Sequence, residues 1–135
     1  MTTDAQDRIS GPTLVISDAI TDADANSTVV AIDIPANTII PPQGVWVEIV
    51  TVFAGGTPSL DVGDGDDDDG WCDTTAITET TVGSYADVDA AYNVTGKLYT
   101  SADTIDVVVA TGATSGCAYI MALMYDVSDV PLTAV

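Results

Sequence analysis

The division of this chain into short β-forming runs limits its fold more than any other feature. The clearest run spans Val45–Phe53, in which apolar residues recur at alternate positions. This alternation is typical of a strand with one face on a core. Its inward-facing positions are expected to be Val45, Val47, Ile49 and Phe53, with Trp46 on the opposite face.

Comparable runs, bounded by Gly, Pro, Asn and Asp, recur about every ten residues. They are Thr13–Ile16, Val29–Ile34, Ile39–Ile40, Ser59–Val62, Gly96–Thr100, Thr104–Ala110 and Cys117–Tyr125. This spacing predicts an all-β protein, an antiparallel β-sandwich or jelly roll of about eight strands.

Turn residues between the runs suggest how some of them pair. Gly55-Gly56 favours a hairpin between Val45–Phe53 and Ser59–Val62. Residues Gly112–Gly116 indicate another tight turn, just before Cys117–Tyr125. Between these regions the pattern is weak, and Ser84–Ala91 allows a short helical turn.

The run Cys117–Tyr125 is apolar on both faces. It should therefore be a central strand, or one that is buried against another subunit. The candidate interface residues are Trp46, Tyr119, Met121 and Leu123.

The chain length fits one domain, which can bury about two-thirds of its unfolded surface. We expect a polar N-terminal arm over residues 1–12 and a β-sandwich over 13–127. The sandwich includes an acidic loop over 61–73, and a tail follows over 128–135. The first residues lack the pattern of a signal peptide, which suggests synthesis in the cytoplasm.

The charge balance excludes several functions. The 135 residues include 21 acidic and two basic side chains, Arg8 and Lys97, and no histidine, for a net charge of −19. Nucleic acid and anionic membranes are not expected as partners, because they need basic residues. Without histidine or an activated nucleophile, an enzyme is not expected either.

The same charge predicts a very salty environment. Carboxylates at this density repel one another strongly in dilute buffer, and molar salt shortens the Debye length to about 3 Å. With 47% hydrophobic residues, the chain should still pack a core. The alternative is an acidic surface protein from an ordinary environment.

The acidic loop raises the question of a metal. Asp64, Asp66 and Asp68 alternate as in an EF-hand calcium loop, but Asp69 replaces its glycine and Thr75 its final glutamate. We favour a solvated loop that holds cations loosely, with a specific Ca²⁺ site or a partner contact as alternatives. No other cofactor is expected.

Two further residue types bear on packing. Cys72 and Cys117 are expected to be buried free thiols, with a single disulfide as the alternative. Trp71 follows the run of aspartates in the acidic loop and is expected to anchor this loop in the core.

Four segments together resemble a family of small virion proteins encoded near the capsid genes of tailed phages and related archaeal viruses. They are Ile34–Thr38, Val45–Phe53, Gly55–Gly65 and Gly96–Val107. The resemblance implies a β-sandwich or jelly-roll subunit without catalytic residues. Such a subunit assembles, often as a trimer, on a capsid or in a tail or fibre.

These observations favour one function. We expect a capsid decoration (cement) protein on the head of a halophilic tailed virus, a homotrimer that contacts the major capsid protein at the virion surface. The alternatives are a tail, baseplate or fibre module for host attachment, and a calcium-binding, adhesin-like cellular domain.

Overall fold

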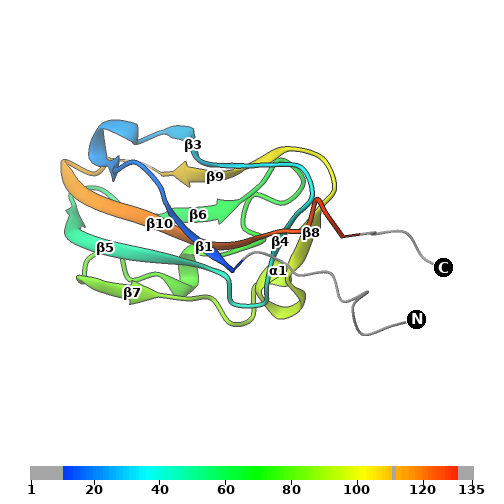
Figure 1. Ribbon diagram of the computed structural model, residues 1–135. Coiled ribbons are helices and arrows are strands. Elements are labelled where there is room, and N and C mark those ends of the chain that lie inside the picture. Colours follow the sequence, from blue (N-terminus) through cyan, green and yellow to red (C-terminus); the bar gives the residue numbers. More distant parts are fainter. Residues whose placement is uncertain (1–10, 111, 131–135) are drawn as a thin grey trace, which may run out of the picture.

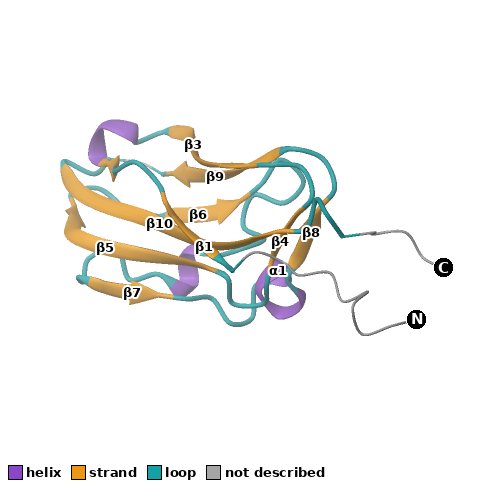
Figure 2. Cartoon of the chain, viewed as in Figure 1, coloured by secondary structure: helices purple, strands orange, loops and turns teal. Residues whose placement is uncertain are grey.

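A computed structural model describes residues 11–110 and 112–130 of the chain. These residues form ten strands in two sheets with only antiparallel pairing (Figures 1 and 2). The all-β sandwich is therefore confirmed, with ten strands rather than about eight. Most of the expected arm and tail lies outside the described residues.

The larger sheet has seven strands. They are β1 (Thr13–Ile16), β2 (Ile20–Thr21), β4 (Thr38–Ile40), β5 (Val45–Ala54), β7 (Gly83–Tyr85), β8 (Lys97–Tyr99) and β10 (Ser115–Asp126). The smaller sheet is formed by β3 (Ser27–Ile34), β9 (Asp103–Val109) and β6 (Leu60–Gly63), in that order. Short helical segments are η2 (Asp22–Asp24), η3 (Thr74–Ala76) and α1 (Ala91–Thr95).

Strand β10 organises the larger sheet, as its two-sided apolar sequence predicts. It pairs with β5 and then β4 along one side, and with β2 and β1 along the other. Its buried residues alternate and include Ala118, Ile120 and Ala122. The residues between them point away from the core, so one strand supplies both the interior and the outer face of its sheet.

The core lies between the two sheets. All four inward positions predicted for β5 are at most 1% exposed: Val45, Val47, Ile49 and Phe53. Two register shifts against β10, one between Ala118 and Cys117 and one between Cys117 and Ser115, interrupt the alternation after Ile49. Each shift adds one residue to β5, so Val50, Thr51 and Val52 are all exposed, and the two together return Phe53 to the inward face.

Both expected hairpins are wrong. Strand β6 does not pair with β5 but crosses to the smaller sheet and pairs with β9, and β9 and β10 likewise belong to different sheets. Gly55 and Gly56 have positive φ angles of 85° and 56°, which turn the chain away from β5. Buried Leu60 and Val62 then complete the opposite side of the core.

The helical turn expected over Ser84–Ala91 is displaced. The structure has strand β7 over Gly83–Tyr85, and the helix begins only at Ala91. Pairing of β7 with β5 outweighs the local sequence preference, because it completes the edge of the larger sheet.

We predict that Gly116→Ala destabilises the fold by about 2–3 kcal/mol. Gly116 has a φ of 141°, and a Cβ there would collide with the ring of buried Phe53. Gly65→Ala is the matched control, because nothing lies within 4 Å of its added Cβ. Chemical denaturation in molar KCl measures both, and equal stability of the two variants would contradict this packing.

Candidate functional site

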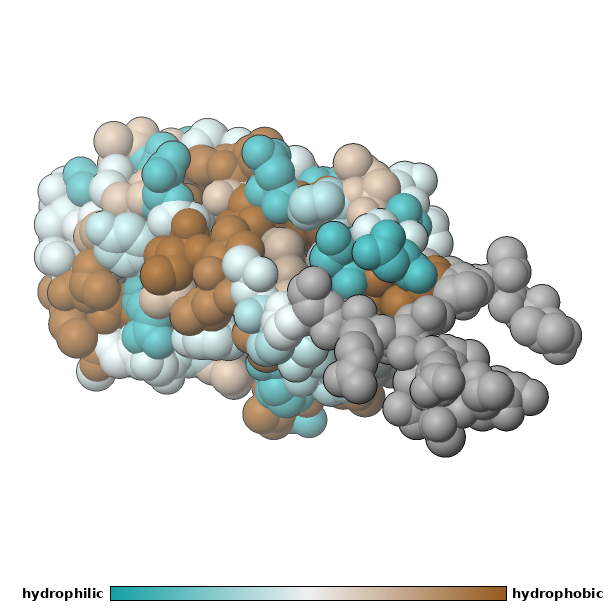
Figure 3. Space-filling view, in the orientation of Figure 1, coloured by the Kyte–Doolittle hydropathy of each residue, from teal (hydrophilic) through white to brown (hydrophobic). Residues whose placement is uncertain are grey.

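The outer face of the larger sheet is the first candidate site. It brings together all four predicted interface residues, Trp46 from β5 and Tyr119, Met121 and Leu123 from β10, at outward-facing positions. Trp46 and Met121 are direct cross-strand partners. Figure 3 shows hydrophobic side chains gathered over the middle of this face, where β10 and β1 lie.

Neighbouring strands extend this surface. Ile16 of β1 is opposite Met121, and Leu14 is opposite Leu123; the two side chains of β1 are 54% and 49% exposed. We use the term apolar band for these six residues, which lie side by side on β1, β10 and β5: Leu14, Ile16, Trp46, Tyr119, Met121 and Leu123.

The apolar band is nearly free of charge. Among the outward-facing strand positions of the described larger sheet, only Glu48 is acidic. Its carboxylate accepts hydrogen bonds from Trp46 Nε1 at 3.0 Å and from the Ser84 hydroxyl at 2.6 Å. In a chain with a net charge of −19, this face has the character of a contact surface.

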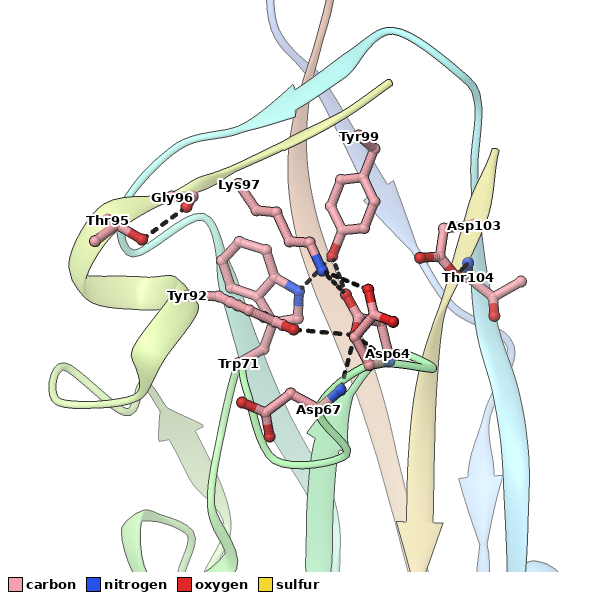
Figure 4. Close-up of polar contacts among 11 residues, drawn as sticks. Asp64, Asp67, Trp71, Tyr92, Thr95, Gly96, Lys97, Tyr99, Asp103 and Thr104 are labelled. Carbon is pink, nitrogen blue, oxygen red and sulfur yellow. Dashed lines mark hydrogen bonds and ion pairs between the residues drawn. The ribbon is translucent and has the colours of Figure 1, made fainter. Parts of the chain in front are cut away.

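The second candidate site surrounds Asp64, whose side chain is fully buried (Figure 4). One carboxylate oxygen, Oδ2, accepts hydrogen bonds from Lys97 Nζ and from the Tyr99 hydroxyl, the latter at 2.8 Å. The other, Oδ1, accepts bonds from the Tyr92 hydroxyl and from the backbone N–H groups of Asp66 and Asp67. Five donors therefore satisfy this buried charge.

Aromatic rings enclose the ion pair. Lys97 Nζ lies 4.2 Å from the ring centre of Tyr92 and 4.8 Å from that of Tyr99. The indole N–H of buried Trp71 donates to the Tyr99 hydroxyl at 3.1 Å. Trp71 thus anchors the end of the acidic loop in the core, as the sequence predicted.

Electrostatics keep both partners charged. Burial acts to raise the pKa of Asp64, but hydrogen bonds from Lys97, Tyr99 and the backbone outweigh it and lower that pKa below its ordinary value. Burial acts in turn to lower the pKa of Lys97, and its bond to Asp64 raises it instead. The arrangement holds the loop in place and supplies no proton near neutral pH.

The sequence suggested Asp64, Asp66 and Asp68 as cation ligands. The structure separates them, because both oxygens of Asp64 are engaged inside the protein while the side chain of Asp66 is 81% exposed. The carboxylates that gather within 4.8 Å belong to Asp67, Asp68 and Asp69. A cation at this loop would therefore be held by these three surface carboxylates, the loose binding that we favour.

Both cysteines are free thiols. Cys72 is fully buried, and burial raises the pKa of its thiol to about 12, so it is unreactive near neutral pH. Cys117 lies on the outer face of the larger sheet and is half-buried, which corrects the expectation that both are buried.

Comparisons with known proteins support the fold. No protein-family model and no curated protein matches the chain. It is similar to a chain in the acidic stable capsid structure of Helicobacter pylori bacteriophage KHP30, with a TM-score of 0.59, 16% identity and coverage of 87% of this chain and 89% of that chain. The chain shares its fold with phage capsid chains.

Two other capsids contain similar chains. In the cyanophage Pam1 capsid the TM-score is 0.54 at 19% identity, with coverage of 92% of this chain and 96% of that chain. In the capsid of Ralstonia phage GP4 the TM-score is 0.53 at 18% identity, with coverage of 93% of this chain and 90% of that chain.

No helix in the described parts of the chain has the length and apolar character needed to cross a membrane.

We predict that Lys97→Met destabilises the protein by about 3 kcal/mol, because it leaves the Asp64 carboxylate buried without its cation. Asp66→Asn is the control, since Asp66 is exposed and 3.6 Å from the amine. The stability that Asp64 contributes should be present above pH 4 and lost as the pH falls through its lowered folded pKa. Urea titrations at and below pH 4 and at neutral pH measure the stability of both variants and its pH dependence. Equal losses of stability in Lys97→Met and Asp66→Asn would contradict the buried ion pair.

The carboxylate group at Asp67–Asp69 predicts the opposite pH response. A hydrogen bond to Asp67, desolvation and repulsion from nearby carboxylates raise the pKa of Asp69 to about 6. The stabilisation that Asp69 contributes to the folded state is therefore fully present below pH 4 and is lost as the pH rises through 6. Asp69→Asn should flatten the stability profile in this window. Thermal unfolding between pH 4 and 7 measures it, and an unchanged profile would contradict the assignment.

Proposed function

We propose that the chain is a capsid decoration (cement) protein on the head of a halophilic tailed virus, and that it acts by protein–protein assembly and not by catalysis. Support comes from the fold shared with chains of three phage capsids. In each comparison about nine-tenths of both chains are covered, so a single sandwich accounts for most of each matched chain.

The observation that carries the proposal is the apolar band. Its residues are exposed or half-buried in the monomer, and the acidic side chains lie almost entirely elsewhere. Burying aliphatic and aromatic surface is worth about 25 cal/mol per Å², whereas an acidic face would have to release its hydration and bring like charges together. The band is thus the face best suited to bind another protein.

Assembly is proposed to involve a homotrimer bound to the major capsid protein. A face that meets a different surface on its neighbour forms a closed ring if the rotation closes. The terminal segments would add contacts to the capsid. Thr13 pairs with Met124, so the described chain begins and ends at the same end of the sandwich, from which both segments can reach one partner. Repetition over many copies would add avidity.

A halophilic host explains the charge. The acidic side chains would hydrate the exposed surface in concentrated salt, where screening removes most of their repulsion. The same conditions favour burial of the apolar band, because strongly hydrated salts strengthen the hydrophobic effect.

We predict that Met121→Asp abolishes assembly through the apolar band while the fold of each subunit is kept. Met121 lies in the apolar band, half-buried beside Trp46, so a carboxylate there would be trapped without a partner in any interface. Val30→Asp is the matched control, since Val30 is 59% exposed and belongs to β3 of the smaller sheet. Light scattering in 3 M KCl measures the oligomeric mass, and circular dichroism checks folding.

The virion role is tested with particles of the virus that encodes the chain. The wild-type protein and Val30→Asp should bind heads that lack it, and Met121→Asp should not. Binding to tails alone would favour the attachment module. Equal binding of both variants to heads would exclude the apolar band as the contact.

A further inference from the structure

The proposed function uses the outer-face side chains of β1 but not the backbone N–H and C=O groups along the free edge of this strand. Among the described residues, β1 pairs only with β10. The Ser17 N–H bonds to the Ile120 carbonyl at 2.9 Å, and alternation along an antiparallel ladder then directs the N–H and C=O groups of Val15 toward β10. The corresponding groups of Leu14 and Ile16 point outward from the sheet edge.

Within Thr13–Ile16 this edge carries no charge, proline or bulge, although Pro12 directly precedes it. Proteins block exposed edge strands with charges, prolines or bulges. The four residues of β1 are Thr, Leu, Val and Ile, all uncharged, and their register with β10 is regular. Among the described residues, Pro12 before the strand and the shortness of the strand limit pairing at this edge. The side chains of Leu14 and Ile16, on the outer face of the sheet, are about half exposed.

We propose that β1 pairs antiparallel with β1 of a second copy across a two-fold axis, so that the two larger sheets become continuous. The N–H and C=O groups of Leu14 and Ile16 that point away from β10 are the donors and acceptors of this pairing. The register that uses all of them in both copies is centred on Val15. Val15 then faces the second copy's Val15, and Leu14 faces its Ile16. Four backbone hydrogen bonds form, and both cross-strand pairs on the outer face are aliphatic.

A second copy fits this edge better than a protein of different composition. The strand is neutral and matches itself in the two-fold register, so it offers no charge by which to select a basic or acidic partner. The contact also continues the apolar band, because Leu14 and Ile16 belong to both. Isologous pairing of this kind is the commonest symmetry among protein oligomers.

The pairing does not depend on the virion role, because it is a property of the isolated protein. If the proposed function also holds, edge pairing provides a second contact that would link neighbouring trimers. Such links would join the bound oligomers into a network over the shell.

Disulfide trapping tests the register directly. In a Cys117→Ala background, Val15→Cys should give a covalent dimer on mild oxidation in 3 M KCl, because directly opposed residues of a non-hydrogen-bonded pair lie about 4.5 Å apart at Cα. Leu14→Cys is the matched control, since its opposite residue is Ile16 and it should cross-link weakly. Non-reducing electrophoresis reads the result. Equal cross-linking of the two variants, or none of Val15→Cys, would overturn the proposal.

A backbone test avoids introduced thiols. Ile16→Pro removes an outward N–H and leaves the β10 ladder intact, so the monomer should fold. Two of the four hydrogen bonds are lost, and dimer association should weaken at least about tenfold. Ile16→Ala keeps the backbone N–H and should weaken dimer association less than Ile16→Pro does. Sedimentation equilibrium in 3 M KCl measures both, in a Met121→Asp background that removes the face contact. Association that Ile16→Pro leaves unchanged would also overturn the proposal.

Discussion

Repulsion among carboxylates is the constraint on which the rest of this structure depends. With 21 acidic and two basic side chains, the fold cannot balance its charges by surface ion pairs. It directs almost all carboxylates to solvent and builds its interior from aliphatic and aromatic residues of two sheets. The outer face of the larger sheet carries only Glu48 among its described outward-facing strand positions, which is why assembly is expected there.

Among the described residues, Asp64 and Glu79 are the buried exceptions, and the structure commits its only lysine to Asp64. Tyr92 comes from α1, and Lys97 and Tyr99 come from β8, while Asp64 directly follows β6 within the acidic loop. One buried carboxylate thus fastens the loop to the end of the larger sheet. Because both oxygens of Asp64 are used internally, the carboxylates of Asp66 and Asp68 in the same loop are left exposed to solvent.

Local patterns in the sequence predicted much of this fold. Alternation located β5 and its inward residues, and the two-sided run at Cys117–Tyr125 identified both the central strand and the face that holds Trp46, Met121 and Leu123. The crossing of β6 and β9 to the second sheet was not predictable, because pairing depends on contacts far apart in the chain. The Asp64 cluster was missed for the same reason, although a lone lysine in so acidic a chain is a signal.

The most direct test of this account is a cryo-electron microscopy map of the virus that carries the chain. The account predicts the protein on the head, with the apolar band covered by protein and the Asp67–Asp69 carboxylates facing solvent. A map in which the outer face of β10 is open to solvent and the acidic loop makes the contact would contradict it.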